Sequence, residues 1–187
     1  MAILPIYNSF HPIMQKHAED VTEFDADLMK TIDDMFDTMY NADGIGLAGN
    51  QIGLAKKIVV IDPASGNDGE TPQPFVMINP EIISSSEEEI DYQEGCLSVP
   101  QFYEKVVRPV SIEVKYFDKK MVEHKEEFDG ILARVMQHEI DHLNGKVFYE
   151  RLSSLRRTLA KNKLKKISRG NFEVDYPMVQ SDGKLVK

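Results

Sequence analysis

The run His138-Glu139-Ile140-Asp141-His142 constrains the fold more than any other stretch of the chain. Helical geometry places residues four apart on one face, so a helix here lets His138 and His142 bind a single metal ion. Glu139 then lies beside that ion, where its carboxylate can move a proton to or from bound water. The motif predicts a metal-carrying helix and favours hydrolysis of an amide or an ester.

The usual patterns downstream of such a motif do not supply a third ligand. One class places a further His six residues after the second one, but Phe148 occupies that position. Another class uses a downstream acid, yet residues 151–172 contain neither Asp nor Glu. Glu150, Glu173 and Asp175 stay open as ligands, although none lies in the expected helical continuation.

Cys96 is the single cysteine of the chain and lies upstream of the motif. A thiolate and two imidazoles leave one position of a tetrahedral ion open for water, as catalytic sites require. A free cysteine is otherwise most often a small buried hydrophobic residue. Beside a two-histidine motif that lacks a downstream ligand, we favour the ligand role and predict a site of Cys96, His138 and His142.

Three segments together resemble the peptide deformylase family. They are Gly44-Ile45-Gly46-Leu47-Ala48-Gly49-Asn50-Gln51, Glu94-Gly95-Cys96-Leu97-Ser98 and Gln137-His138-Glu139-Ile140-Asp141-His142. Their order and separations are similar to those of the family, and the resemblance covers essentially the whole chain. It implies a bacterial-type deformylase, which removes the formyl group from the N-terminal formyl-methionine of nascent polypeptides and releases formate.

Hydrophobic periodicity predicts helices and strands that follow each other with little regular alternation, which favours an α+β fold. The predicted helices span 26–40, 130–144 and about 153–168, and the predicted strands span 57–61, 75–78, 106–107, 111–117 and 121–128. A stretch rich in Pro, Gly, Asp and Ser predicts a loop over 62–74. The resemblance implies antiparallel β-sheets surrounding a central metal-binding helix, with a C-terminal helix. Residues 1–187 are expected to form a single catalytic domain.

The resemblance also implies how the site acts. Metal-bound hydroxide attacks the formyl carbon, while Glu139 takes the proton from the attacking water and later gives it to the leaving amine. The side-chain amide of Gln51 and the backbone N–H of Leu97 stabilise the oxyanion. Without the family match, Gln51 would be interpreted as an ordinary polar loop residue.

Two groups of residues are candidates for binding the peptide. Glycines leave the backbone of Gly44-Ile45-Gly46 accessible, so an extended peptide can add there as a strand; a simple turn is the alternative. Leu97, Ile131 and Val135 are predicted to form an apolar pocket for the methionine side chain. Ile131 and Val135 are also expected to pack inward from the metal helix.

Glu94, Arg108 and Asp141 are expected to support the ligands from outside. A carboxylate that accepts the free ring N–H of a ligand histidine fixes the tautomer of that histidine. For Arg108, an exposed ion pair is an equally good interpretation.

The cofactor is expected to be one divalent ion. The resemblance implies Fe(II) in the cell, and Zn, Ni or Co can substitute because a thiolate makes the site soft. One alternative function is a metallopeptidase, which the missing downstream ligand and the use of Cys96 disfavour. The other is a non-enzymatic domain with a structural metal site. That alternative needs a fourth protein ligand, for which His11, His17 and His124 are available.

Charge is distributed unevenly along the chain. The net charge is -9, yet residues 151–169 hold eight of the 22 basic residues and none of the 31 acidic ones. This asymmetry indicates an anionic partner, and contact of the basic C-terminal helix with the ribosome is predicted, with a solvated face as the alternative. Leu152, Leu155 and Leu159 are expected to dock this helix on the body.

Other partners and compartments are disfavoured. No apolar run approaches the ~20 residues that span a membrane, so no membrane contact is expected, and nothing predicts DNA binding. A lone cysteine suits a reducing, cytoplasmic environment.

Overall fold

A computed structural model describes residues 2–62 and 73–187. The helices are α1 (Ala26–Asn41), α2 (Gly130–Leu143) and α3 (Ser154–Ser168), with short 3-10 helices η1 (Pro12–Gln15), η2 (Gly49–Ile52) and η4 (Phe148–Arg151). The strands are β1 (Ile6–Tyr7), β2 (Gly46–Ala48), β3 (Ile58–Ile61), β4 (Phe75–Ser85), β5 (Glu89–Cys96), β6 (Val99–Pro109), β7 (Ser111–Phe117), β8 (Glu123–Asp129), β9 (Met178–Val179) and β10 (Leu185–Val186). Most of the loop predicted over 62–74 lies outside the described residues.

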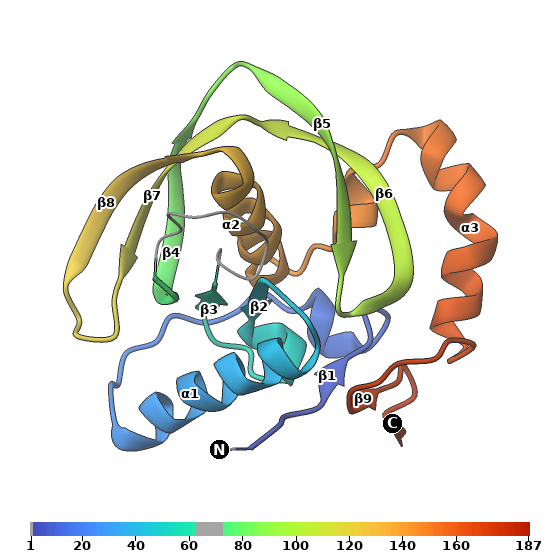
Figure 1. The fold of residues 1–187 in the computed structure, drawn as a ribbon, viewed down its shortest axis with the longest axis horizontal. Coiled ribbons are helices and arrows are strands. Elements are labelled where there is room, and N and C mark those ends of the chain that lie inside the picture. The colour runs from blue at the N-terminus through green and yellow to red at the C-terminus, as the bar shows by residue number, and fades with distance from the viewer. Residues whose placement is uncertain (1, 63–72) are drawn as a thin grey trace.

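The predicted α+β fold is confirmed. A five-stranded antiparallel sheet has the order β2-β3-β4-β7-β8, and β5 pairs with β6 in a long hairpin. Figure 1 shows α2 between these two units, as the family resemblance implied. A third, small sheet has the order β1-β9-β10, and its β1–β9 pairing is the parallel exception.

Helix α2 is central because the five-stranded sheet buries apolar side chains against it, while the β5–β6 hairpin is joined to it by buried hydrogen bonds. Strand β7 alternates, and its buried Ile112, Val114 and Tyr116 share one core cluster with Met136 and Ile140 of the helix. From Ala133 to Leu143 every residue of α2 is buried, polar ones included. The helix therefore carries its histidines inside the molecule, where burial suits a metal site.

Helix α2 ends as the sequence predicted. Its C-cap is Asn144, and Gly145 follows with φ +67°. A Cβ atom on Gly145 would lie 2.5 Å from the backbone oxygen of Gln15, so both the left-handed conformation and the close packing require glycine.

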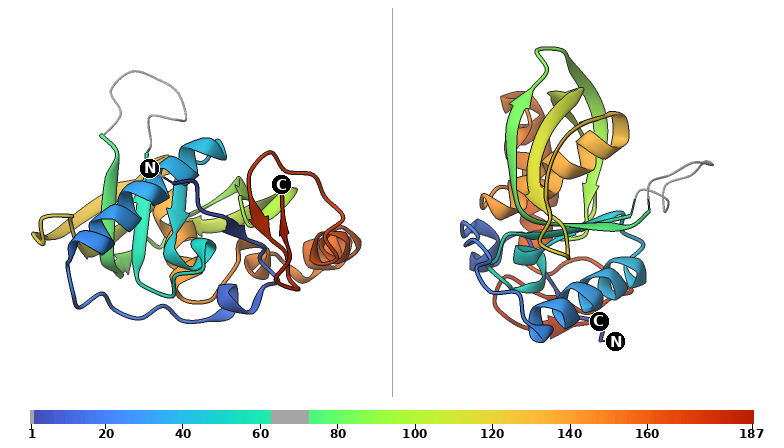
Figure 2. Two further views of the ribbon diagram at one scale, coloured as in Figure 1. Left: turned by 90° about the horizontal axis from the view of Figure 1, so that it is seen from below. Right: turned by 90° about the vertical axis from the view of Figure 1, so that its left-hand side faces the viewer.

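The predicted docking of α3 through Leu155 and Leu159 is wrong. These side chains are 70% and 74% exposed, and the helix docks instead through Ala160, Leu164 and Ile167. The buried stripe packs in one cluster with Val99, Phe102 and Val106 of β6, while Leu152 precedes the helix and is buried. Two apolar stripes at helical spacing are present, and the stripe that packs against β6 is the covered one. Helices α1 and α3 lie at opposite ends of the molecule (Figure 1, Figure 2).

None of the helices in the described part of the chain has the length and apolar character needed to cross a membrane.

Candidate metal centre and active site

The three predicted ligands meet at one point. Cys96 is the last residue of β5, while His138 and His142 lie one turn apart on α2. Their potential ligand atoms all lie within 4.8 Å of one another, and the Sγ atom of Cys96 is 3.2 Å from Nε2 of His142. The long β5–β6 hairpin, whose pairing is irregular between Gly95 and Cys96, thus delivers sulfur to the histidine face of the helix.

The alternatives left open by the sequence do not join this group. Within residues 2–62 and 73–187, the Cys96-His138-His142 set is the one cluster of His, Cys, Asp and Glu with metal-binding spacing. It includes none of the acids considered as third ligands and none of the histidines considered as fourth ligands, namely Glu150, Glu173, Asp175, His11, His17 and His124. A three-residue donor set leaves room for water on a tetrahedral ion, which is typical of catalytic centres and not of structural ones.

Glu94 fixes the orientation of His138. Its Oε2 atom lies 2.9 Å from Nδ1 of the histidine ring, so Nε2 is left to face the centre. Burial lowers the pKa of His138, but hydrogen bonds to Cys96 and Glu94 outweigh burial and raise it to about 10. The surroundings of this ring therefore favour a positive charge, which a divalent cation would supply.

His142 provides a neutral imidazole. It is completely buried, and burial together with the charge of His138 lowers its pKa to about 3. A neutral ring nitrogen is the form of histidine that binds metals. The sulfur of Cys96 and the two buried imidazoles thus form a ligand set that fits a divalent transition metal ion.

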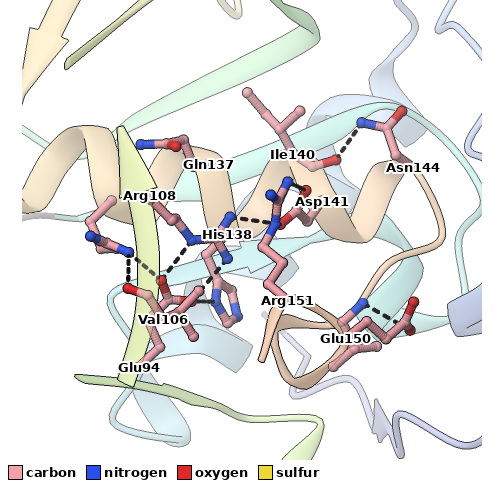
Figure 3. Close-up of polar contacts among 12 residues, drawn as sticks. Glu94, Val106, Arg108, Gln137, His138, Ile140, Asp141, Asn144, Glu150 and Arg151 are labelled. Carbon is pink, nitrogen blue, oxygen red and sulfur yellow. Dashed lines mark hydrogen bonds and ion pairs between the residues drawn. The ribbon is translucent and has the colours of Figure 1, made fainter. Parts of the chain in front are cut away.

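A buried network of charges holds the ligand-bearing elements together (Figure 3). Arg108 of β6 donates to both oxygens of Glu94, at 2.6 and 2.9 Å, and to Oδ2 of Asp141 at 2.7 Å. Arg151 also donates to Asp141. Burial opposes ionisation of Glu94, but hydrogen bonds from His138 and Arg108 hold its pKa well below the ordinary value. Arg108 is buried in this network and not in an exposed ion pair, whereas Asp141 contacts arginines and no ligand ring.

Arg134 belongs to the same network and was missed by the sequence analysis. Its Nη1 atom donates to Glu94 and to the Val106 carbonyl, both at 2.9 Å, and its Nη2 atom donates to the Ile90 carbonyl at 2.7 Å. Helix α2 is thereby tied to both strands of the hairpin. Its position four residues before His138, on the same face of the helix, was a usable signal.

Glu139 lies beside the three ligands with one oxygen uncommitted. Its side chain is buried, and its Oε2 atom has no hydrogen-bond partner among the described residues. Burial raises the pKa of Glu139 to about 7, near which a group can both accept and release a proton in neutral solution. A Cβ atom on Gly46 would lie 2.7 Å from Oε1 of Glu139. Strand β2 therefore passes so close to the carboxylate that a residue with a side chain would displace it.

Gln51 points its amide nitrogen toward the same place. Its Oε1 atom accepts a hydrogen bond from the backbone N–H of Ala48, which fixes the direction of the amide group. The Nε2 atom is 3.6 Å from Sγ of Cys96 and 3.3 Å from the Ser98 hydroxyl. Its donor hydrogens are therefore directed at the centre.

The centre opens into a pocket of about 540 Å³. Its walls include all the candidates for peptide binding and catalysis outside the ligand set, namely Gly44, Ile45, Gly46, Gln51, Leu97, Ile131, Val135 and Glu139. The prediction that Ile131 packs inward is wrong, because it lies in the first turn of α2 and is 51% exposed. Val135, one turn deeper, is buried.

Tyr176 also lines the pocket, together with its neighbours from Glu173 onward. Its hydroxyl donates to the Leu97 carbonyl at 2.7 Å. This contact joins residues 79 positions apart, so no local pattern in the sequence pointed to it.

A helix that carries two buried histidines and an uncommitted glutamate, completed by a distant cysteine above a pocket, defines the class of metal-dependent hydrolases. Comparison with known proteins gives the family. Residues 3–158 match the polypeptide deformylase family model. The chain is 41% identical to the peptide deformylase of Salinibacter ruber, over 98% of both proteins.

Solved structures agree with this comparison. A peptide deformylase from Legionella pneumophila is 43% identical with a TM-score of 0.80, over 90% of this chain and 96% of that one. A peptide deformylase from Synechococcus elongatus, in complex with actinonin, is 40% identical with a TM-score of 0.80, over 91% of this chain and 89% of that one. The chain belongs to the polypeptide deformylase family.

Proposed function

We propose that this protein removes the formyl group from N-formylmethionyl peptides and releases formate. The observation that carries the proposal is the uncommitted, buried carboxylate of Glu139 next to the Cys-His-His group at the bottom of a pocket. Membership of the deformylase family supports the same reaction. We further propose that residues 1–187 act as one catalytic domain in the cytoplasm.

Cys96, His138 and His142 would hold one divalent ion. When bound, the ion would act as a Lewis acid and would lower the pKa of a water molecule to about 7. Fe(II) is the ion that we propose for the cell, with Zn, Ni or Co as substitutes, because a ligand set of one thiolate and two imidazoles accepts all four.

Glu139 acts as general base and then as general acid. Its Oε2 atom takes the proton of the attacking water and later delivers it to the α-amine that leaves, which a pKa of about 7 permits in both directions. Gln51 Nε2–H and Leu97 N–H stabilise the developing oxyanion. The side-chain amide of Gln51 is held by its hydrogen bond from the Ala48 N–H, so little reorganisation of this donor is needed during the reaction.

The peptide backbone would add to β2. This strand is an edge of the five-stranded sheet, and Gly44, Ile45 and Gly46 face the pocket from it and from the turn before it. Backbone hydrogen bonds at a sheet edge recognise any extended peptide. Leu97, Ile131 and Val135 would contact the methionine side chain.

The direct test compares formyl-Met-Ala-Ser with acetyl-Met-Ala-Ser and with an internal peptide bond. We expect formate from the first substrate, no acetate from the second and no cleavage of the third. Glu139→Gln should reduce formate release by roughly 10²–10⁴-fold while the protein still binds one equivalent of metal. Cleavage of internal peptide bonds at a comparable rate would instead indicate a metallopeptidase.

We also propose that α3 contacts the ribosome. Its lysines at 161, 163, 165 and 166 are exposed, as are Leu155 and Leu159, so the outer face combines positive charge with apolar side chains. Ribosomal RNA attracts such a face through its phosphates. The contact would hold the pocket near emerging nascent chains.

A further inference from the structure

The side-chain amide of Gln51 is hydrogen-bonded at both of its ends. Its Oε1 atom accepts from the Ala48 N–H at 2.8 Å, and its Nε2 atom donates to the hydroxyl oxygen of Ser98 at 3.3 Å. A primary amide has two N–H groups. Ser98 uses one of them, and the other faces Sγ of Cys96, which lies 3.6 Å from Nε2. The second N–H is therefore the one available to an oxyanion at the centre.

Ser98 is held firmly where it meets this amide. It lies in the two-residue turn between β5 and β6, which Cys96 and Val99 close by pairing with each other. The residue is completely buried, and its carbonyl accepts from the Ser9 N–H at 2.8 Å. The backbone that carries the hydroxyl is thus anchored to a second segment, and bulk water does not compete for the hydroxyl oxygen.

The 3-10 helix η2, which carries Gln51, is held by separate contacts. The amide nitrogen of the neighbouring Asn50 donates to the carbonyls of Lys16 and His142, at 2.7 and 2.9 Å. The backbone on each side of the Gln51–Ser98 contact is therefore fixed without that contact. What the contact decides is the direction of the Gln51 amide group.

We propose that Ser98 is a positioning residue for deformylation, because its hydroxyl accepts one N–H of Gln51 and thereby aims the other at the oxyanion. The inference rests on the proposed function, since it names the residue that keeps one oxyanion donor in line. Without the hydroxyl, the amide keeps its bond to Ala48 and can rotate about it, and a buried N–H is left without its acceptor. A donor that must be reoriented during the reaction stabilises the transition state less than one already in place.

The size of the effect lies between two limits. Loss of an oxyanion donor reduces kcat by roughly 10²–10³-fold. Loss of one hydrogen bond between neutral groups changes an equilibrium by about two- to twelvefold. Because Ser98→Ala disorders the donor but does not remove it, we expect kcat for formyl-Met-Ala-Ser to fall about tenfold. The oxyanion develops only in the transition state, so KM should change by less than about twofold.

A double-mutant cycle with Gln51 separates positioning from a purely structural role. Ser98→Ala should lower kcat about tenfold in the parent but less than about twofold in the Gln51→Ala background, where no amide is left to orient. Both single variants and the double variant should still bind one equivalent of metal. Ser9→Ala is the matched control and should leave kcat unchanged. It removes the hydroxyl of another buried serine, which no hydrogen bond joins to Gln51 in the described part of the chain.

A second readout does not depend on turnover. NMR relaxation of the Gln51 side-chain amide in zinc-loaded protein, assigned by the loss of its signals in Gln51→Ala, reports how rigidly the amide is held. We expect an order parameter near the rigid value of about 0.85 in the parent and below about 0.6 in Ser98→Ala.

Equal effects of Ser98→Ala in the two backgrounds, or a mobile Gln51 amide in the parent, would overturn the inference and leave the proposed function intact. A loss of kcat in Ser9→Ala as large as that in Ser98→Ala would do the same. Absence of formate release from the parent protein would overturn the proposed function itself.

Discussion

At the scale of single residues, Arg108 is the largest fully buried side chain in the described part of the molecule. It is 1% exposed, and its guanidinium joins Glu94, which orients His138, to Asp141. Arg108→Met leaves both carboxylates short of a buried partner and should lower the free energy of unfolding by about 3 kcal/mol, as measured by urea denaturation.

Arg156→Met is the matched control. Arg156 pairs with Asp91 and Glu104, but its side chain is 38% exposed. The same chemical change should therefore cost less than about 1 kcal/mol. Equal losses for the two variants would show that the buried network contributes no more than an exposed pair.

Gly46 tests whether the position of Glu139 matters. In Gly46→Ala the new methyl group would lie 2.7 Å from Oε1 of Glu139 and 2.9 Å from Cγ1 of Val135, so the carboxylate must move. A displacement of this size should lower kcat/KM by about 100-fold. The ligand residues are untouched, so the metal content should remain at one equivalent, and unchanged activity would contradict the role of Glu139.

At the scale of elements, the β7–β8 hairpin carries a pH-dependent contact. His124 lies 3.2 Å from Asp118 and 3.3 Å from Glu126, and its ring stacks on Tyr116. The hydrogen bond to Asp118 raises the pKa of His124, Glu126 adds to the rise, and partial burial opposes it. No other charged group is paired with this histidine among the described residues.

The sign of the effect follows from the raised pKa. Charged His124 stabilises the folded state fully below the unfolded pKa of about 6.5, and this contribution is lost as the pH rises through the folded value. His124→Gln should therefore be less stable than the parent at pH 6, by at most about 1 kcal/mol, and the difference should vanish at pH 9. His17→Gln is the control. A difference that grows with pH would contradict the assignment.

Helix α3 is the second element with a distinct prediction. Deleting it would strip Leu164 and Ile167 from the core, so charge substitutions are the cleaner test of ribosome contact. Lys161→Gln/Lys165→Gln/Lys166→Gln should weaken ribosome binding about tenfold at low salt and flatten its salt dependence. The matched triple Lys119→Gln/Lys120→Gln/Lys146→Gln should bind like the parent, and equal affinity of all three proteins would exclude the contact.

At the scale of the whole molecule, the site is assembled from parts that the sequence predicts unequally. The His138–His142 face follows from helical spacing. Cys96 was predicted as the third ligand from the family resemblance and from the lack of downstream ligands, and the structure brings it to this face. Helices α1 and α2 were also predictable, since each has a clear apolar period and a clear end. Contacts between distant segments could not be predicted from the sequence. Tyr176 with Leu97 and Arg134 with the hairpin depend on how the strands curve around α2, which no local pattern encodes.

The same limit explains the wrong prediction for α3. Leu155 and Leu159 have the spacing of a buried stripe, but so do Ala160, Leu164 and Ile167, and the surface of β6 covers the second set. A periodic pattern gives the faces of a helix, while the rest of the molecule selects the buried one.

The central claim is that one metal ion, bound through the Cys96 thiolate and two imidazoles, is required for formate release. Metal-free protein titrated with Co(II) under anaerobic conditions tests it, with absorbance and formate release from formyl-Met-Ala-Ser followed together. We predict that a thiolate-to-cobalt charge-transfer band and activity rise in parallel and saturate at one equivalent, and that Cys96→Ser loses both. Full activity without added metal, or activity that saturates without the thiolate band, would contradict the account.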